Sequence, residues 1–99
     1  MEMFILVCIR YNIHPIVLFH FAFEKKVPKI SQKSIMGYFL EFCEIDSSKR
    51  LFVADVPEFV EDYCLDILSN KVKLPEITIE HRMAIIELNT YVRGAPQFV

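Results

Sequence analysis

The chain lacks the residues on which several common kinds of site depend. Its 99 residues include no tryptophan and only two glycines, Gly37 and Gly94. A phosphate-binding loop needs several glycines close together, so a loop of that kind is excluded. The three cysteines, Cys8, Cys43 and Cys64, are widely spaced and form no C-x-x-C pair. We therefore predict no disulfide framework and no cysteine zinc site, but buried, reduced thiols in a protein of the cytoplasm, the nucleus or both.

An excess of positive charge is also missing. The net charge is −2, from 11 basic and 13 acidic residues. The strongest basic run covers residues 24–33, with four lysines and one acid. A nucleic-acid binder usually carries a basic face, whereas a few lysines in a polar segment are typical of a solvated loop. The sequence therefore argues against a nucleic-acid partner.

The histidines and carboxylates form no recognisable catalytic or metal-binding motif. His14 and His20 stand six residues apart with no third ligand nearby, and the pair Glu80 and His81 lacks the spacing of a zinc-protease helix. The acidic residues between 58 and 66 fall on the polar face of an amphipathic helix, where solvation explains them. We therefore predict no enzymatic activity, no cofactor and no metal.

Two apolar runs lie near the N-terminus, Met3–Ile9 and Ile16–Phe23, with a polar segment between them. Each run is too short to cross a bilayer, so we expect no membrane span. Both have strand length, and Pro15 can open the second, which predicts a β-hairpin. A continuous apolar run does not by itself exclude a helix, and the second run leaves that alternative open.

Capping residues and periodicity indicate the elements of the middle of the chain. Ser31 stands at an N-cap position before apolar residues at helical spacing as far as Cys43. The short apolar run Leu51–Ala54 predicts a third strand. Asp55, followed three residues later by Glu58, predicts the start of a helix with one apolar stripe that extends to residue 68.

A last helix is predicted from Thr78, its N-cap, to Val92, with Gly94 and Pro96 as stop signals. Its apolar residues cover more than one face, which is typical of a helix that contacts both its own core and a partner. Apolar residues make up 54% of the chain, above the usual share of about 45–50%. We therefore expect the isolated protein to self-associate or to need a partner.

The predicted order of elements is strand, strand, helix, strand, helix, helix. This order predicts an α+β fold in which helices cover a small three-stranded sheet that includes the N-terminal hairpin. The length suits a single domain over residues 1–99. Residues 94–99 are expected to form a flexible tail.

The second half of the chain contains three motifs in a characteristic order. Leu51–Pro57 reads as a strand ending in an apolar residue and a proline, Lys71–Lys73 is a short basic segment, and Pro75–Ile79 reads Pro-Glu-Ile-Thr-Ile. In this order the motifs resemble elongin C and other Skp-type members of the BTB/POZ family. Ile77 stands where that family has an aromatic residue.

The resemblance implies a BTB/POZ-like fold and a non-enzymatic adaptor of a cullin-type ubiquitin ligase. The implied partners are an elongin B-like subunit at a sheet edge, a cullin, and a substrate-receptor helix held in a C-terminal apolar groove. Helix-in-groove recognition needs a row of apolar side chains at helical spacing. Carried over to this sequence, the groove residues are Ile67, Ile77, Ala84, Ile85, Leu88 and Val92.

A second interpretation belongs to a different class. Ser31 and Tyr38, the segment Asp55–Tyr63, and Thr78 with Arg82 are similar to parts of the helical, DNA-binding core-binding domain of tyrosine recombinases. That domain has no N-terminal hairpin and needs a basic concave face. Strand content would favour the adaptor, and nearly pure helix would favour the recombinase domain.

Overall fold

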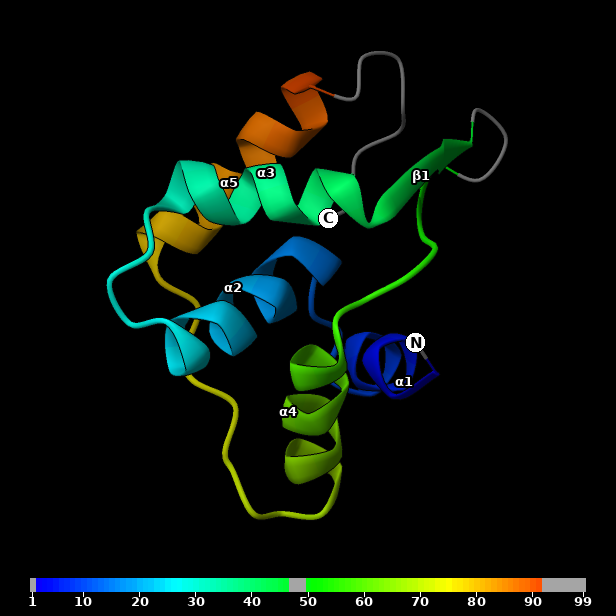
Figure 1. Ribbon diagram of the computed structural model, residues 1–99, viewed down its shortest axis with the longest axis vertical. Helices are drawn as coiled ribbons and strands as arrows, with labels where there is room; N and C mark the ends of the chain where they lie inside the picture. The colour runs from blue at the N-terminus through cyan, green and yellow to red at the C-terminus, as the bar shows by residue number, and fades with distance from the viewer. Residues whose placement is uncertain (1, 47–49, 92–99) are drawn as a thin grey trace.

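The computed structural model describes residues 2–46 and 50–91, which form five helices and one two-stranded ribbon (Figure 1). The helices are α1 (Glu2–Arg10), α2 (Pro15–Lys26), α3 (Gln32–Glu41), α4 (Glu58–Leu68) and α5 (Ile79–Tyr91), and the strands are β1 (Cys43–Asp46) and β2 (Arg50–Val53). Val92 and the expected tail, residues 94–99, lie outside the described residues.

The predicted N-terminal hairpin is wrong, because both apolar runs are helical. A left-handed residue, Asn12 at φ 49°, ends the turn after α1. His14 then caps α2 by accepting a hydrogen bond on Nδ1 from the backbone N–H of Ile16, at 3.1 Å, and Pro15 occupies the first helical turn. All eight residues of Ile16–Phe23 are buried. A helix that is apolar on every side belongs in the interior, and this explains why its sequence shows no helical period.

Helix α2 forms the centre of the molecule. Figure 1 shows α3 and α5 on one side of it and α1 and α4 on the other, and α2 contacts all four. The buried ring of Phe19 lies at the centre of the aromatic core. Its centroid is 4.8 Å from that of Phe23, 5.3 Å from that of Phe39 and 6.2 Å from that of Phe4. One central helix therefore replaces the expected sheet as the surface on which the other helices pack.

The described residues contain no three-stranded sheet, so the predicted BTB/POZ-like α+β fold is wrong. The third predicted strand does form, as β2, but its partner is β1, in an antiparallel ribbon whose register pairs Cys43 with Val53. Ser31 caps α3 as expected, through its hydroxyl and the backbone N–H of Ser34. The helix predicted to extend from Ser31 to Cys43 ends earlier, at Glu41, because the chain enters β1 at Cys43.

The two C-terminal helices begin in different ways. Helix α4 has Pro57 at its N-cap and no side-chain cap bond, so the expected capping by Asp55 is wrong. Its predicted stripe is confirmed at Val60, Tyr63, Cys64 and Ile67, all of which are buried. Thr78 caps α5 as predicted, and its carbonyl accepts the backbone N–H of Arg82.

Among the described residues, no single helix has the length and apolar character needed to cross a membrane. The segments Met3–Arg10 and Pro15–Lys26 meet that requirement only as a pair, bent by 116°.

Candidate functional site

The structure does not gather the five described members of the predicted groove on one open surface. Three of them, Ile67, Ala84 and Leu88, are core residues with at most 2% of their surface exposed. Ile85 is partly buried against the core, and Ile77 is exposed in the segment before α5. The sixth, Val92, lies outside the described residues. A receptor helix cannot reach the three buried side chains, because α2 and α3 pack against α5, and α1 and α2 pack against α4.

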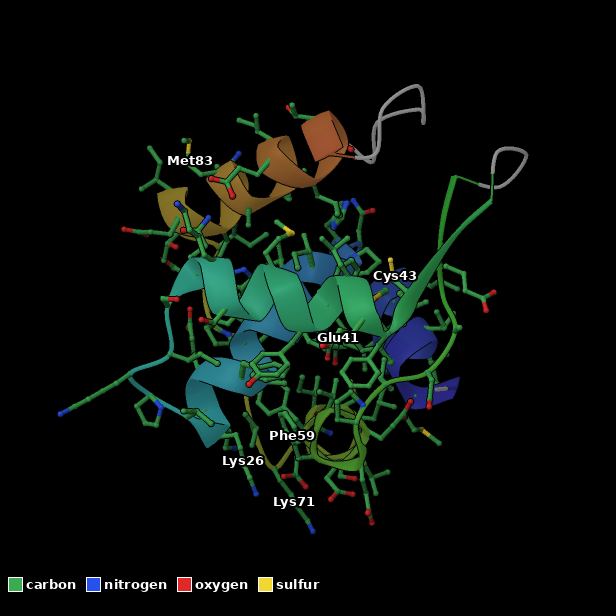
Figure 2. The ribbon with its side chains drawn as sticks, turned by 45° about the horizontal axis from the view of Figure 1, so that its top comes forward. Lys26, Glu41, Cys43, Phe59, Lys71 and Met83 are labelled. Carbon is green, nitrogen blue, oxygen red and sulfur yellow. The ribbon has the colours of Figure 1, made fainter. Side chains whose placement is uncertain are left out.

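A different row of α5 faces solvent. Ile79, Met83 and Ile86 are 71%, 48% and 58% exposed. Figure 2 shows Met83 on the side of α5 that points away from the other helices. We call these three residues the outer row of α5. Two exposed charges, Arg82 and Glu87, flank it.

His81 starts α5 with a reciprocal pair of hydrogen bonds. Its Nδ1 accepts the backbone N–H of Thr78 at 3.1 Å, and its own backbone N–H donates to Thr78 Oγ1 at 3.4 Å. This is the arrangement of a capping box, with histidine in the place usually taken by glutamate or glutamine. The pattern Thr78-x-x-His81 was the sequence signal for it, which the comparison of Glu80 and His81 with a zinc-protease helix did not use.

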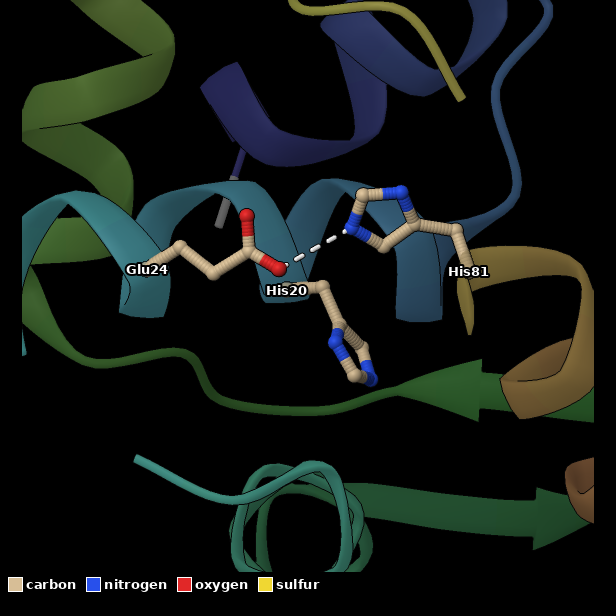
Figure 3. A group of neighbouring side chains, drawn as sticks. All are labelled: His20, Glu24 and His81. Atoms are coloured by element: carbon tan, nitrogen blue, oxygen red, sulfur yellow. Dashed lines mark hydrogen bonds and ion pairs between the residues drawn. The ribbon is translucent and has the colours of Figure 1, made fainter. Parts of the chain in front are cut away.

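The other ring nitrogen of His81 joins α5 to α2. Its Nε2 lies 3.1 Å from Glu24 Oε1, and the ring lies edge-on to Phe21 with centroids 4.7 Å apart (Figure 3). Since Nδ1 accepts the Thr78 N–H, the ring proton is on Nε2 and is donated to Glu24. His81 is buried, whereas the Glu24 side chain is 51% exposed.

His20, one helical turn before Glu24, completes a cluster of three side chains. One ring nitrogen of His20, a carboxylate oxygen of Glu24 and a ring nitrogen of His81 all lie within 4.8 Å of one another. His20 is only 2% exposed, and its Nε2 has no hydrogen-bond partner among the described residues. Burial, and secondarily the charge of His81, lowers the pKa of His20 to about 4. His20 is therefore neutral at pH 7, with a ring nitrogen free to bind an electrophile.

A cavity of about 310 Å³ lies between the end of α2 and α4. Its polar lining mixes charges, with Lys25 and Lys26 from α2 and Asp62 and Asp66 from α4. Lys25 Nζ also lies 5.2 Å from the centre of the Tyr63 ring. The first two lysines of the basic run therefore belong to a helix and lie beside acids and aromatic rings. The interpretation of this run as a solvated loop did not predict that placement.

The thiols have no activated environment. Cys64 is buried, Cys8 and Cys43 are partly buried, and all three are free. Burial raises the pKa of Cys8 and Cys64 to about 12 and that of Cys43 to about 11. Because the thiolate is the nucleophile, these side chains are protonated and unreactive at neutral pH.

A scan against protein-family models found no match to this chain, and comparisons with the curated proteins and with the solved structures found none either.

Proposed function

We propose that this chain is a non-enzymatic interaction module that pairs with a second copy of itself through the outer row of α5. The observation that supports this most directly is the exposure of Ile79, Met83 and Ile86 on one helix face. The proposal keeps the protein-binding role expected from the sequence and moves the binding surface from the buried row to the exposed one.

The spacing of the outer row suits helix pairing. Ile79, Met83 and Ile86 are separated by four and three residues, which are the successive d, a and d positions of a heptad. The opposite row, His81, Ala84 and Leu88, is held in the protein's own core. Because α5 is already fixed in place, pairing does not require the helix to be ordered first, and this lowers the entropic cost of binding.

The flanking charges favour a second copy of the chain in a parallel arrangement. In heptad terms Arg82 is a g residue and Glu87 is the following e residue. A parallel pair places each g residue beside the following e residue of the other helix, so Arg82 of each copy faces Glu87 of the other. An antiparallel pair would place Glu80 beside Glu87, two like charges. The two contacts in the parallel pair are equivalent by symmetry, as in a closed twofold dimer.

Sedimentation velocity over a wide range of protein concentration tests the proposal. The wild type should form dimers, and Met83→Glu should be monomeric, with a melting temperature equal to that of the wild type at concentrations where the wild type is also monomeric. Arg82→Glu should weaken the dimer, and adding Glu87→Arg should restore it. Leu65→Glu is the matched control, because Leu65 is an equally exposed apolar residue on α4. A wild type that stays monomeric, or equal disruption by Leu65→Glu, contradicts the proposal.

The more specific partners implied by the resemblance are not part of the proposal. An elongin B-like subunit would bind the edge of a sheet. A substrate-receptor helix would contact Ile67, Ala84 and Leu88, which are buried in the protein's own core. The link to a cullin-type ubiquitin ligase depended on the same fold. The adaptor interpretation therefore continues only as a protein-binding role.

The DNA-binding domain of a tyrosine recombinase is the second candidate function, because that domain is helical and the described residues are mostly helical. Against it, Lys25 and Lys26 line a cavity together with Asp62 and Asp66, which offsets their charge toward a phosphate backbone. Fluorescence anisotropy with a labelled DNA duplex at low salt separates the two functions. We expect no binding; salt-dependent binding that is lost in Lys25→Glu/Lys26→Glu would favour the recombinase candidate.

A further inference from the structure

We propose that His20, Glu24 and His81 bind a divalent transition-metal ion, with Zn²⁺ as the ion to test, and that this ion links α2 to α5. The site is separate from the outer row of α5 and does not depend on pairing. It also reverses the prediction from sequence that the chain has no metal site.

One ligand atom from each of the three side chains lies within 4.8 Å of the other two. His20 and Glu24 are four residues apart on α2, so they project from the same face of the helix, and His81 approaches from the first turn of α5 (Figure 3). Metal–ligand bonds of about 2.0–2.1 Å in a tetrahedral site place neighbouring ligand atoms about 3.3 Å apart. The Glu24 oxygen and His81 Nε2, at 3.1 Å, meet that spacing, and the His20 nitrogen, within 4.8 Å of both, needs only a small side-chain movement.

The donor set has the chemistry of a borderline divalent ion. Two imidazoles and one carboxylate are a common ligand set for zinc and for other first-row metals, whereas hard ions such as Mg²⁺ prefer oxygen ligands alone. His20 is neutral at pH 7, as coordination requires. The His20 ring is buried, and one of its nitrogens lies within 4.8 Å of the Glu24 oxygen and of the His81 nitrogen.

Thr78 provides support for the metal-bound form of His81. To bind metal through Nε2, His81 must move its ring proton to Nδ1, so that the Thr78 N–H loses its acceptor there; Thr78 Oγ1, 3.0 Å from Nδ1, is placed to accept that ring proton. Ligating histidines usually donate their second ring N–H in this way. The Glu24 side chain is half exposed, so the ion has a path from solvent and keeps at least one position for water.

Isothermal titration of the metal-free protein with Zn²⁺ tests the site, followed by Co²⁺, whose visible absorption reports its coordination. We expect one ion per chain, and a rise in melting temperature of roughly 10–20 °C at a hundredfold excess over Kd. His20→Phe should preserve the fold, because it places an aromatic ring in an apolar site. It should weaken Zn²⁺ binding roughly a hundredfold or more, since loss of even an outer-shell partner costs 10 to 100-fold.

Two further variants complete the test. Glu24→Gln keeps an oxygen to accept the His81 N–H but loses the charged ligand, so it should also weaken binding. Glu80→Gln removes the same charge from the neighbour of His81 and should bind Zn²⁺ as the wild type does. No saturable binding by the wild type, or unchanged affinity in both His20→Phe and Glu24→Gln, would overturn the proposal. Neither result bears on dimer formation, which is measured without metal.

Discussion

His81 Nε2 lies 3.1 Å from Glu24 Oε1, a contact between residues 57 positions apart that fastens the first turn of α5 to the end of α2. With the capping bonds to Thr78, it fixes how α5 is rotated about its axis. Ala84 and Leu88 consequently face the core, and Met83 and Ile86 face solvent. The two faces of α5 should therefore respond differently to substitution.

The first prediction compares one residue from each face. Leu88→Ala should lower the free energy of unfolding by about 2–5 kcal/mol, because it leaves a cavity in the core. Ile86→Ala should change it by less than about 0.5 kcal/mol, because the side chain is mostly exposed. Urea denaturation at a concentration where the chain is monomeric measures both. An equal decrease in the free energy of unfolding for both variants would mean that α5 does not turn Leu88 toward the core and Ile86 toward solvent.

The second prediction concerns the histidine capping box. His81→Ala should lower the free energy of unfolding by about 1–2 kcal/mol, because the Thr78 N–H and Glu24 both lose a partner. His81→Gln should recover much of this loss, since its amide can accept from Thr78 and donate to Glu24. Denaturant titration of the two variants is the measurement. If Gln is no better than Ala, the ring packs against Phe21 and His20 without a capping role.

The third prediction is a loss of stability in mild acid. The pKa of His20 is about 4 in the folded chain and about 6.5 when unfolded, so between these values the unfolded state binds more protons. The contribution of His20 to the free energy of unfolding is fully present above pH 6.5. It decreases as the pH drops toward 4, by an amount on the order of 3 kcal/mol. His20→Phe should flatten this part of the stability curve. Parallel curves for the two proteins between pH 7 and 4 would contradict the assignment.

The fourth prediction concerns thiol reactivity. Because burial raises the pKa of all three cysteines, the folded protein should react slowly with a thiol reagent at pH 8. In denaturant all three should react rapidly. Rapid labelling of one native cysteine would show that its surroundings open in solution.

The sequence predicted local features well and the N-terminal fold badly, for a physical reason. Ser31 and Thr78 act as caps because capping depends on neighbouring residues, and the stripe of α4 has a clear helical period. The residues from Ile16 to Phe23 have no period, because every side of α2 is buried. Only tertiary context distinguishes such a helix from a strand.

The candidate metal site was hidden for a related reason. His20 and Glu24 have a helical spacing that carries meaning only if their segment is a helix, and the sequence favoured a strand there. His81 joins them through the packing of α5 on α2, which no local pattern encodes. The buried groove residues show the same limit, since the sequence of α5 offers apolar residues on both faces and does not say which one faces inward.

Disulfide trapping distinguishes a parallel pair, in which the outer row of α5 faces the same row of a second copy, from every other arrangement. In a parallel pair residue 79 lies beside its equivalent, whereas in an antiparallel pair the two are far apart. Ile79→Cys should therefore form a disulfide-linked dimer under mild oxidation, while the wild type, whose thiols are buried or partly buried, and Leu65→Cys should not. An Ile79→Cys protein that remains monomeric on a non-reducing gel, or that crosslinks no faster than Leu65→Cys, would contradict the account.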